Sequence, residues 1–157
     1  MKGNDKVIAA LNQALHEELT ALSQYFVHGE MCENWKFEKL AKYTKKLSIM
    51  EMKHAERLIE RILFLDGTPN LAYPSQFKIG KTVKEQLTDD LEGELDAVKS
   101  YNEAVALARA EGDNGSADLF AANLKDEEEH ADWAEAQLSL IKEIGYERYL
   151  SSQMEAE

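Results

Sequence analysis

The sequence contains little of what a secreted or membrane protein needs. Cys32 is the only cysteine among 157 residues, which excludes an internal disulfide and a cluster of thiolate ligands. No apolar run approaches the ~18 residues expected of a membrane span. Residues 1–5 lead into an amphipathic pattern rather than an apolar leader. We therefore expect a cytoplasmic protein with no membrane partner.

Positive charge is also scarce. The chain has 18 lysines and arginines against 30 acidic residues, which gives a formal net charge of -12. Proteins that bind nucleic acid usually present a basic surface, so we expect no nucleic-acid partner. An acidic surface attracts cations, although surplus acid more often serves solubility alone.

Proline and glycine are few and clustered, a pattern that favours long helices. Apolar residues at helical spacing predict helices over about 5–34, 37–65, 83–111 and 116–144, and a weaker pattern predicts a fifth over 147–153. Asn4 is expected to cap the first helix and Gly145 to end the fourth. A chain of this length supports one core, so we predict a single all-α domain over residues 1–157.

The connection between the second and third helices is long. It covers residues 67–82, includes Pro69, Pro74 and Gly80, and has no helical period. Fully extended, such a segment reaches ~50 Å, whereas a helix of ~30 residues is ~45 Å long. The segment can therefore return the chain to the opposite end of the bundle. This predicts a four-helix bundle with a long crossover.

Two copies of a Glu-x-x-His pattern interrupt the apolar faces of these helices. Glu51 precedes His54, and Glu127 precedes His130, by three residues. Residues three apart share one face of a helix, so each pair presents a carboxylate beside an imidazole. Such a pair can bind one side of a metal ion, and the bundle can hold a di-metal site between two pairs.

The two copies belong to a repeat with an offset of 76 residues (94 − 18). It relates Glu18 to Glu94, Glu51 to Glu127, His54 to His130, and Tyr25 to Tyr101. In each half, 33 residues separate the two glutamates (51 − 18 and 127 − 94), and the midpoint falls at a predicted break between helices. The two glutamates of each helix pair are therefore level with each other.

These six polar residues could instead be buried groups that satisfy one another. Four carboxylates brought together without cations would repel and lose hydration, which favours the metal interpretation. Four carboxylates and two imidazoles suit two first-row ions, and iron or manganese better than a structural zinc. We predict that two of the carboxylates bridge the ions, namely Glu51 and Glu127. The terminal ligands are then Glu18 with His54, and Glu94 with His130.

Several short stretches resemble one known family. They are residues 1–3, 25–26, 51–55, 61–65, 126–128 with His130, and 132–133. In these the chain resembles the ferritins, and the bacterioferritins in particular. The resemblance implies a shell of twenty-four chains built from two-fold dimers. It also implies a ferroxidase centre at the six residues above, where O2 or H2O2 oxidises Fe(II) that is then stored as ferric mineral. A ferredoxin-type reductant would release the stored iron.

The same resemblance implies that Met52 is the axial ligand of a haem b shared between two subunits. Met52 is about 100° around the helix from Glu51 and lies off the metal-facing stripe. Together with Ile49 it forms a second apolar patch, and Leu19 and Phe26 form another on the first helix. A methionine used only for interface packing would give the same pattern.

Other positions qualify the resemblance. Lys46 and Met50 stand where the family is expected to have a His and an Asp that help iron leave the centre. This disfavours an iron-exchange route through the centre, and the alternative is a site that holds its metals permanently, as a cofactor. Tyr25 resembles the family tyrosine beside the di-iron site, where it hydrogen-bonds a ligand or donates an electron; a plain core tyrosine is the alternative. His16 and His28 have no Glu three residues before them and are predicted to be surface residues.

Two other functions compete with iron storage. One is a di-iron or di-manganese peroxidase or oxidase that stores nothing, although the chain has no Cys-x-x-Cys motif of the rubrerythrin type. The other is a DNA-protecting mini-ferritin, which the net acidity and the lack of a basic tail disfavour. Iron storage with ferroxidase activity is the leading hypothesis.

Overall fold

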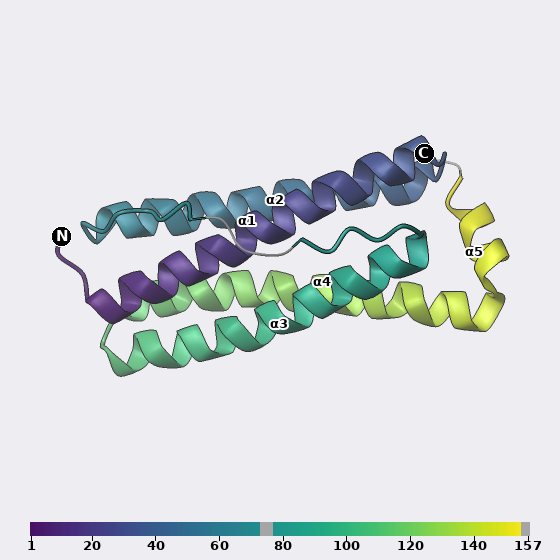
Figure 1. Ribbon diagram of the computed structural model, residues 1–157. Helices are drawn as coiled ribbons and strands as arrows, with labels where there is room; N and C mark the ends of the chain where they lie inside the picture. Colours follow the sequence, from purple (N-terminus) through teal and green to yellow (C-terminus); the bar gives the residue numbers. More distant parts are fainter. Residues whose placement is uncertain (73–76, 155–157) are drawn as a thin grey trace.

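Four long helices lie side by side in the computed structural model, which describes residues 1–72 and 77–154 (Figure 1). Their bounds are α1 Asp5–Asn34, α2 Glu38–Phe64, α3 Val83–Ala110 and α4 Asn114–Ile144, followed by the short α5 Tyr146–Ser152. The predicted all-α bundle with a short fifth helix is confirmed. Pro74 of the predicted crossover lies outside the described residues.

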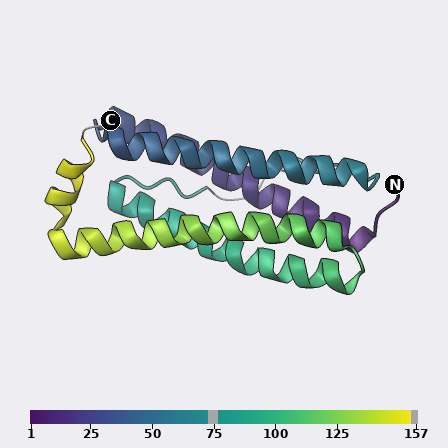
Figure 2. The ribbon, with the colours of Figure 1, turned by 180° about the vertical axis from the view of Figure 1, so that it is seen from behind.

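Two antiparallel hairpins, α1–α2 and α3–α4, make up the bundle. Figures 1 and 2 show that α3 begins at the end of the bundle where α2 begins, so α3 is parallel to α2 and α4 is parallel to α1. Within the described residues, no helix is long and apolar enough to cross a membrane. The helices present their apolar stripes to one another.

Side-chain caps explain where the helices begin. The Asn4 side chain accepts hydrogen bonds from the backbone N–H groups of Lys6 and Val7 at 2.8 and 3.2 Å. Asp113 accepts from the N–H of Ser116 at 2.9 Å, so α4 begins two residues earlier than the sequence predicts. Such caps satisfy N–H groups that have no partner in the first turn. Every observed helix end lies within two residues of its predicted position.

The crossover is tied to α1 at several points along its length. Asn12 in the second turn of α1 accepts the N–H of Asn70 at 2.7 Å. Further along, Gln24 accepts the N–H of Lys78 at 2.9 Å. The described parts of the crossover therefore follow α1 toward its C-terminal end, as the predicted return of the chain requires.

His28 corrects one prediction. It was expected at the surface, but its side chain is completely buried where the end of the crossover covers α1. Nδ1 lies 2.9 Å from Asp90 Oδ1 on α3, and Nε2 accepts the N–H of Gly80 at 3.1 Å. The imidazole thus joins α1, α3 and the crossover. His16, the other predicted surface histidine, is half-buried.

Two apolar clusters fill the bundle on either side of its middle. One lies toward the α1 N-terminus and includes Leu11, Leu58 and Phe120. The other includes Leu87 and Tyr149, and α5 closes this end of the bundle. Each is a packed apolar layer, which shields polar side chains between the two layers from solvent along the bundle axis.

Candidate metal centre

Six polar side chains from four helices meet between the two apolar layers. Each is at most 3% exposed, although carboxylates and imidazoles are rarely buried without a partner. The set consists of Glu18 on α1, Glu51 and His54 on α2, Glu94 on α3, and Glu127 and His130 on α4. All six residues predicted from the repeat are therefore brought together.

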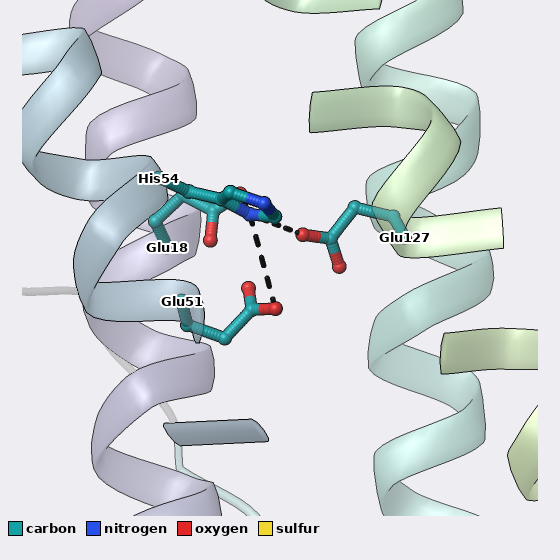
Figure 3. A group of neighbouring side chains, drawn as sticks. All are labelled: Glu18, Glu51, His54 and Glu127. Carbon is teal, nitrogen blue, oxygen red and sulfur yellow. Dashed lines mark ion pairs between the residues drawn. The ribbon is translucent and has the colours of Figure 1, made fainter. Parts of the chain in front are cut away.

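The six side chains form two overlapping groups, each with four potential ligand atoms within 4.8 Å of one another. The first group is Glu18, Glu51, His54 and Glu127, drawn in Figure 3. The second is Glu51, Glu94, Glu127 and His130. Only Glu51 and Glu127 belong to both groups, which is the arrangement expected of bridging carboxylates.

Around His54, the nearest carboxylate comes from the opposite hairpin. His54 Nδ1 lies 2.8 Å from Glu127 Oε1, 3.3 Å from Glu18 Oε1 and 3.9 Å from Glu51 Oε1. Figure 3 shows the Glu127 carboxylate reaching this imidazole from α4 and the Glu51 carboxylate approaching it from α2. The same nitrogen that faces the acids is the one available to a metal ion.

The second imidazole repeats the arrangement. His130 Nδ1 lies 3.1 Å from Glu51 Oε1, 3.5 Å from Glu94 Oε1 and 3.7 Å from Glu127 Oε2. The two rings are stacked with centroids 6.4 Å apart. Glu18 and Glu94 therefore each approach one imidazole, while Glu51 and Glu127 approach both.

Protons hold the cluster together when no cation is present. Burial lowers the pKa of His54, but hydrogen bonds with Glu127 and Glu18 outweigh burial and raise that pKa to about 11. Burial also lowers the pKa of His130, yet Glu127 and Glu94 raise it to about 9. Both imidazoles are therefore cationic at neutral pH in the metal-free protein.

The carboxylates are perturbed by the same crowding. Burial, and then the neighbouring acids, raise the pKa values of Glu18, Glu51 and Glu94. Burial alone would also raise the pKa of Glu127, but hydrogen bonds with Glu94, His130 and His54 outweigh it and hold that pKa well below its usual range. Glu127 is thus the anion around which the other groups share protons.

Unpaired atoms indicate that hydrogen bonds within the cluster do not satisfy all of its polar groups and that bound cations would satisfy more of them. Three buried atoms of the cluster lie outside the ion pairs described above and have no hydrogen-bond partner among the described residues, namely Glu18 Oε2, Glu94 Oε2 and His130 Nε2. A buried polar atom without a partner costs about 1–3 kcal/mol. Metal ions would satisfy the two carboxylate oxygens among them.

Two tyrosines hold the outer carboxylates. The Tyr25 hydroxyl donates to Glu94 Oε1, so the tyrosine predicted beside the site does contact it. The Tyr101 hydroxyl donates to Glu18 Oε1 at 2.5 Å and accepts from Asn123 Nδ2 at 3.2 Å. The repeat paired Tyr101 with Tyr25, but the sequence prediction assigned a role only to Tyr25.

Asp126 is a further contact that the sequence prediction missed. Its Oδ2 lies 2.8 Å from His54 Nε2, the ring nitrogen that faces away from the carboxylates. A carboxylate behind a ligating histidine fixes the ring orientation and leaves the other nitrogen free for a metal. The signal available in the sequence was the position of this acid immediately before a predicted ligand.

Met52 lies apart from the cluster. Its side chain is 52% exposed, close to the exposure of Ile49 on the same helix and of Phe26 on α1. The predicted second apolar patch on α2 is therefore present at the surface. Glu128 and Glu129 are also exposed, because their positions rotate away from the ligand face of α4.

A cavity of about 310 Å³ connects the cluster with the surface between α1 and α3. Buried Glu18 and Glu94 line its inner part, whereas Glu92 and Asp96 are exposed at its edge. Acidic walls in a low-dielectric cleft attract cations and exclude anions. The cavity therefore suits the passage of metal ions.

Comparisons with known proteins agree with this geometry. The ferritin-like domain family matches residues 8–144. A bacterioferritin of Brucella melitensis is 48% identical over 95% of this chain and 92% of its own length. The chain belongs to the bacterioferritins of the ferritin family. Similar proteins of that name occur in Rhodobacter capsulatus, at 47% identity over 92% of this chain and 90% of the relative, and in Streptomyces coelicolor, at 43% over 99% and 93%.

The ferritin-like domain match over residues 8–144 spans every residue of the candidate metal centre. The resemblance expected from short motifs is confirmed over nearly the whole chain. Family membership therefore rests on long-range similarity and not on the six candidate ligands alone.

Proposed function

We propose that this chain is the subunit of an iron-storage protein that oxidises Fe(II) at the buried cluster and keeps the ferric product in a protein shell. The observation that carries this is the pair of overlapping four-ligand groups, which include buried atoms without a hydrogen-bond partner among the described residues. Bacterioferritin relatives agree with iron as the metal. The chain is thus a ferroxidase as well as a store.

Charge balance explains why the cluster suits two divalent ions. Once the imidazoles have lost their protons, the four carboxylates balance the charge of two Fe(II) ions. The loaded site would then be close to neutral, which matters because burial penalises a net charge. Iron held there would supply one electron per ion to O2 or H2O2. In this proposal Glu51 and Glu127 would be shared by both ions, and Glu18 with His54 and Glu94 with His130 would each hold one ion.

The chain's own residues prepare this site before iron arrives. Tyr25 and Tyr101 hold the terminal carboxylates in place, which reduces the rearrangement that metal binding requires. The acidic cavity between α1 and α3 admits cations from the surface. Apolar layers on both sides keep bulk water away from the reacting centre.

Assembly and haem binding extend the proposal. We infer a shell of twenty-four chains built from two-fold dimers, located in the cytoplasm and emptied by a ferredoxin-type reductant. The exposed apolar patch with Met52, Ile49 and Phe26 supports a dimer contact. A soft thioether within such a patch can ligate haem iron, so Met52 would hold a haem b shared with the partner subunit.

One substitution tests the site assignment. Glu51→Ala removes a ligand of both groups and should abolish rapid Fe(II) oxidation, measured by stopped-flow absorbance, while circular dichroism shows unchanged helical content. Glu128→Ala is the matched control, because it removes an exposed glutamate from α4 and should leave the rate unchanged. An unchanged initial rate in Glu51→Ala would refute the assignment.

Particle size separates storage from the competing oxidase. A large hollow assembly in light scattering and electron microscopy supports the shell. Elution near a monomer or dimer, combined with retained oxidation, would instead favour the non-storing di-iron or di-manganese enzyme.

A further inference from the structure

One lysine lies among the many carboxylates that line the cavity between α1 and α3. Lys78 belongs to the crossover, and it is the only lysine or arginine among the described residues that line this cavity. Its Nζ lies 2.7 Å from Glu92 Oε1 on α3. A route that otherwise attracts cations therefore has a positive charge in its wall.

We infer that Lys78 is an electrostatic barrier that limits how fast divalent cations enter this cavity from solvent. Its ammonium group competes with an incoming ion for the carboxylates at the outer edge. This inference rests on the proposed di-metal function and names a residue that sets the rate of ion entry, not a ligand of the cluster.

Three acids face the Lys78 ammonium group. The hydrogen bond with Glu92, and then the charges of Glu92, Asp89 and Asp96, raise the pKa of Lys78, so this side chain is a cation at neutral pH. All three acids line the cavity, and Glu92 and Asp96 are exposed. An ion that arrives from solvent therefore meets them before it meets the buried ligands, and at that point it also meets Lys78.

Hydrogen bonds fix the backbone that carries Lys78. Its N–H donates to Gln24 Oε1 at 2.9 Å, and Gln24 Nε2 donates to Asp90 Oδ1 at 3.0 Å. Two residues later, the N–H of Gly80 donates to the fully buried His28 at 3.1 Å. The Lys78 side chain, in contrast, is 50% exposed, and a lysine stem is flexible. Movement of this side chain alone can therefore make room for an ion.

The ion pair between Lys78 and Glu92 is weak enough for a divalent ion to displace it. Both side chains are at least half exposed, and solvent screens pairs of this kind. Lys78 should therefore slow entry without preventing it. In water, a positive charge ~8 Å from a divalent ion lowers the encounter rate about fivefold. The effect should vanish in 1 M salt, where the Debye length is about 3 Å.

Cobalt(II) measures entry without redox chemistry, because it is stable in air and its d–d absorption reports ligation. In stopped-flow mixing of cobalt(II) with the assembled, metal-free protein at low ionic strength, Lys78→Gln should associate about fivefold faster than the wild type. The equilibrium affinity of the cluster should change little, as is usual for a charge at the edge of a binding site. With Fe(II), kcat/KM should rise by the same factor while kcat stays unchanged.

Control variants separate this local charge from the net charge of the protein. Lys84→Gln removes an exposed lysine of α3 that is not among the residues lining the cavity, and Lys78→Arg keeps the charge in place. Both should associate at the wild-type rate. Glu92→Gln removes an attracting acid and should slow association, and the double variant with Lys78→Gln should return close to the wild-type rate.

The outcomes distinguish this inference from the proposed function. An unchanged association rate in Lys78→Gln, an equal acceleration in Lys84→Gln, or an altered kcat at saturating iron would overturn the role of Lys78 and leave the di-metal proposal intact. A wild-type protein whose cluster binds no cobalt(II) would overturn both.

Discussion

Metal binding at the cluster should expel protons, and the structure sets how many. At pH 7.5 the metal-free protein carries a proton on His54, whose pKa is raised to about 11, and on His130, whose pKa is raised to about 9. Both Nδ1 atoms must lose their protons to bind metal. Two bound cobalt ions should therefore release about two protons per chain, with more where raised glutamate pKa values keep a carboxyl protonated.

This stoichiometry makes the affinity strongly dependent on pH. Each displaced proton changes the binding free energy by about 1.4 kcal/mol per pH unit, so the overall affinity should rise about a hundredfold per unit near pH 7. A pH-stat titration with cobalt(II) measures the released protons, and absorption measures the affinity. His54→Gln should release one proton fewer.

The high-pH limit provides an internal control. Above the pKa of His130, at about 9, that imidazole is already neutral, and proton release should fall by about one. Release of fewer than one proton per pair of ions at pH 7.5 would refute the picture of a cluster held together by two imidazolium ions.

Three other predictions concern stability and haem. Protonation of the two imidazoles stabilises the metal-free fold because their pKa values are raised in the folded state. This contribution to stability is complete below pH 6.5. It is lost as pH rises through about 9 for His130 and about 11 for His54. The melting temperature after chelation should therefore fall between pH 7 and 9, and a rise would contradict this reasoning. His28→Ala deprives the fold of a fully buried side chain with two partners and should destabilise it by about 3 kcal/mol in denaturant unfolding. His16→Ala should cost about 0.5 kcal/mol or less, and equal losses would be inconsistent with the structural role of His28. Met52→Leu should remove the Soret band of bound haem and Met52→His should alter it; a wild type that binds no haem would end that proposal.

The helices and the six candidate ligands could be predicted because both follow from local periodicity. Each candidate ligand interrupts an apolar stripe. Because the repeat gives each of them an equivalent in the other half of the chain, every assignment is supported twice. Glu51 and His54, for example, are on one face through the geometry of a single helix turn. Their meeting with Glu127 then requires only that two hairpins pack face to face.

The supporting contacts could not be predicted in this way. Asp126 reaches His54 from another helix, and its direction depends on how α4 is rotated against α2. His28 is buried because the crossover passes over it, and an irregular segment has no period from which its path can be inferred. Contacts of this kind depend on how the elements pack against one another. The residue spacing within one element carries no information about that packing.

The division of ligands between the hairpins gives the metal centre a second consequence. In the first group, three ligands come from α1–α2 and Glu127 comes from α3–α4; in the second, three come from α3–α4 and Glu51 comes from α1–α2. An ion bound to either group would therefore cross-link two halves that are otherwise joined covalently only by the crossover. Loading the site should resist the separation of the hairpins by mass action, even in a chain cut within the crossover. The amount of iron available in the cell would then set how firmly the subunit holds together.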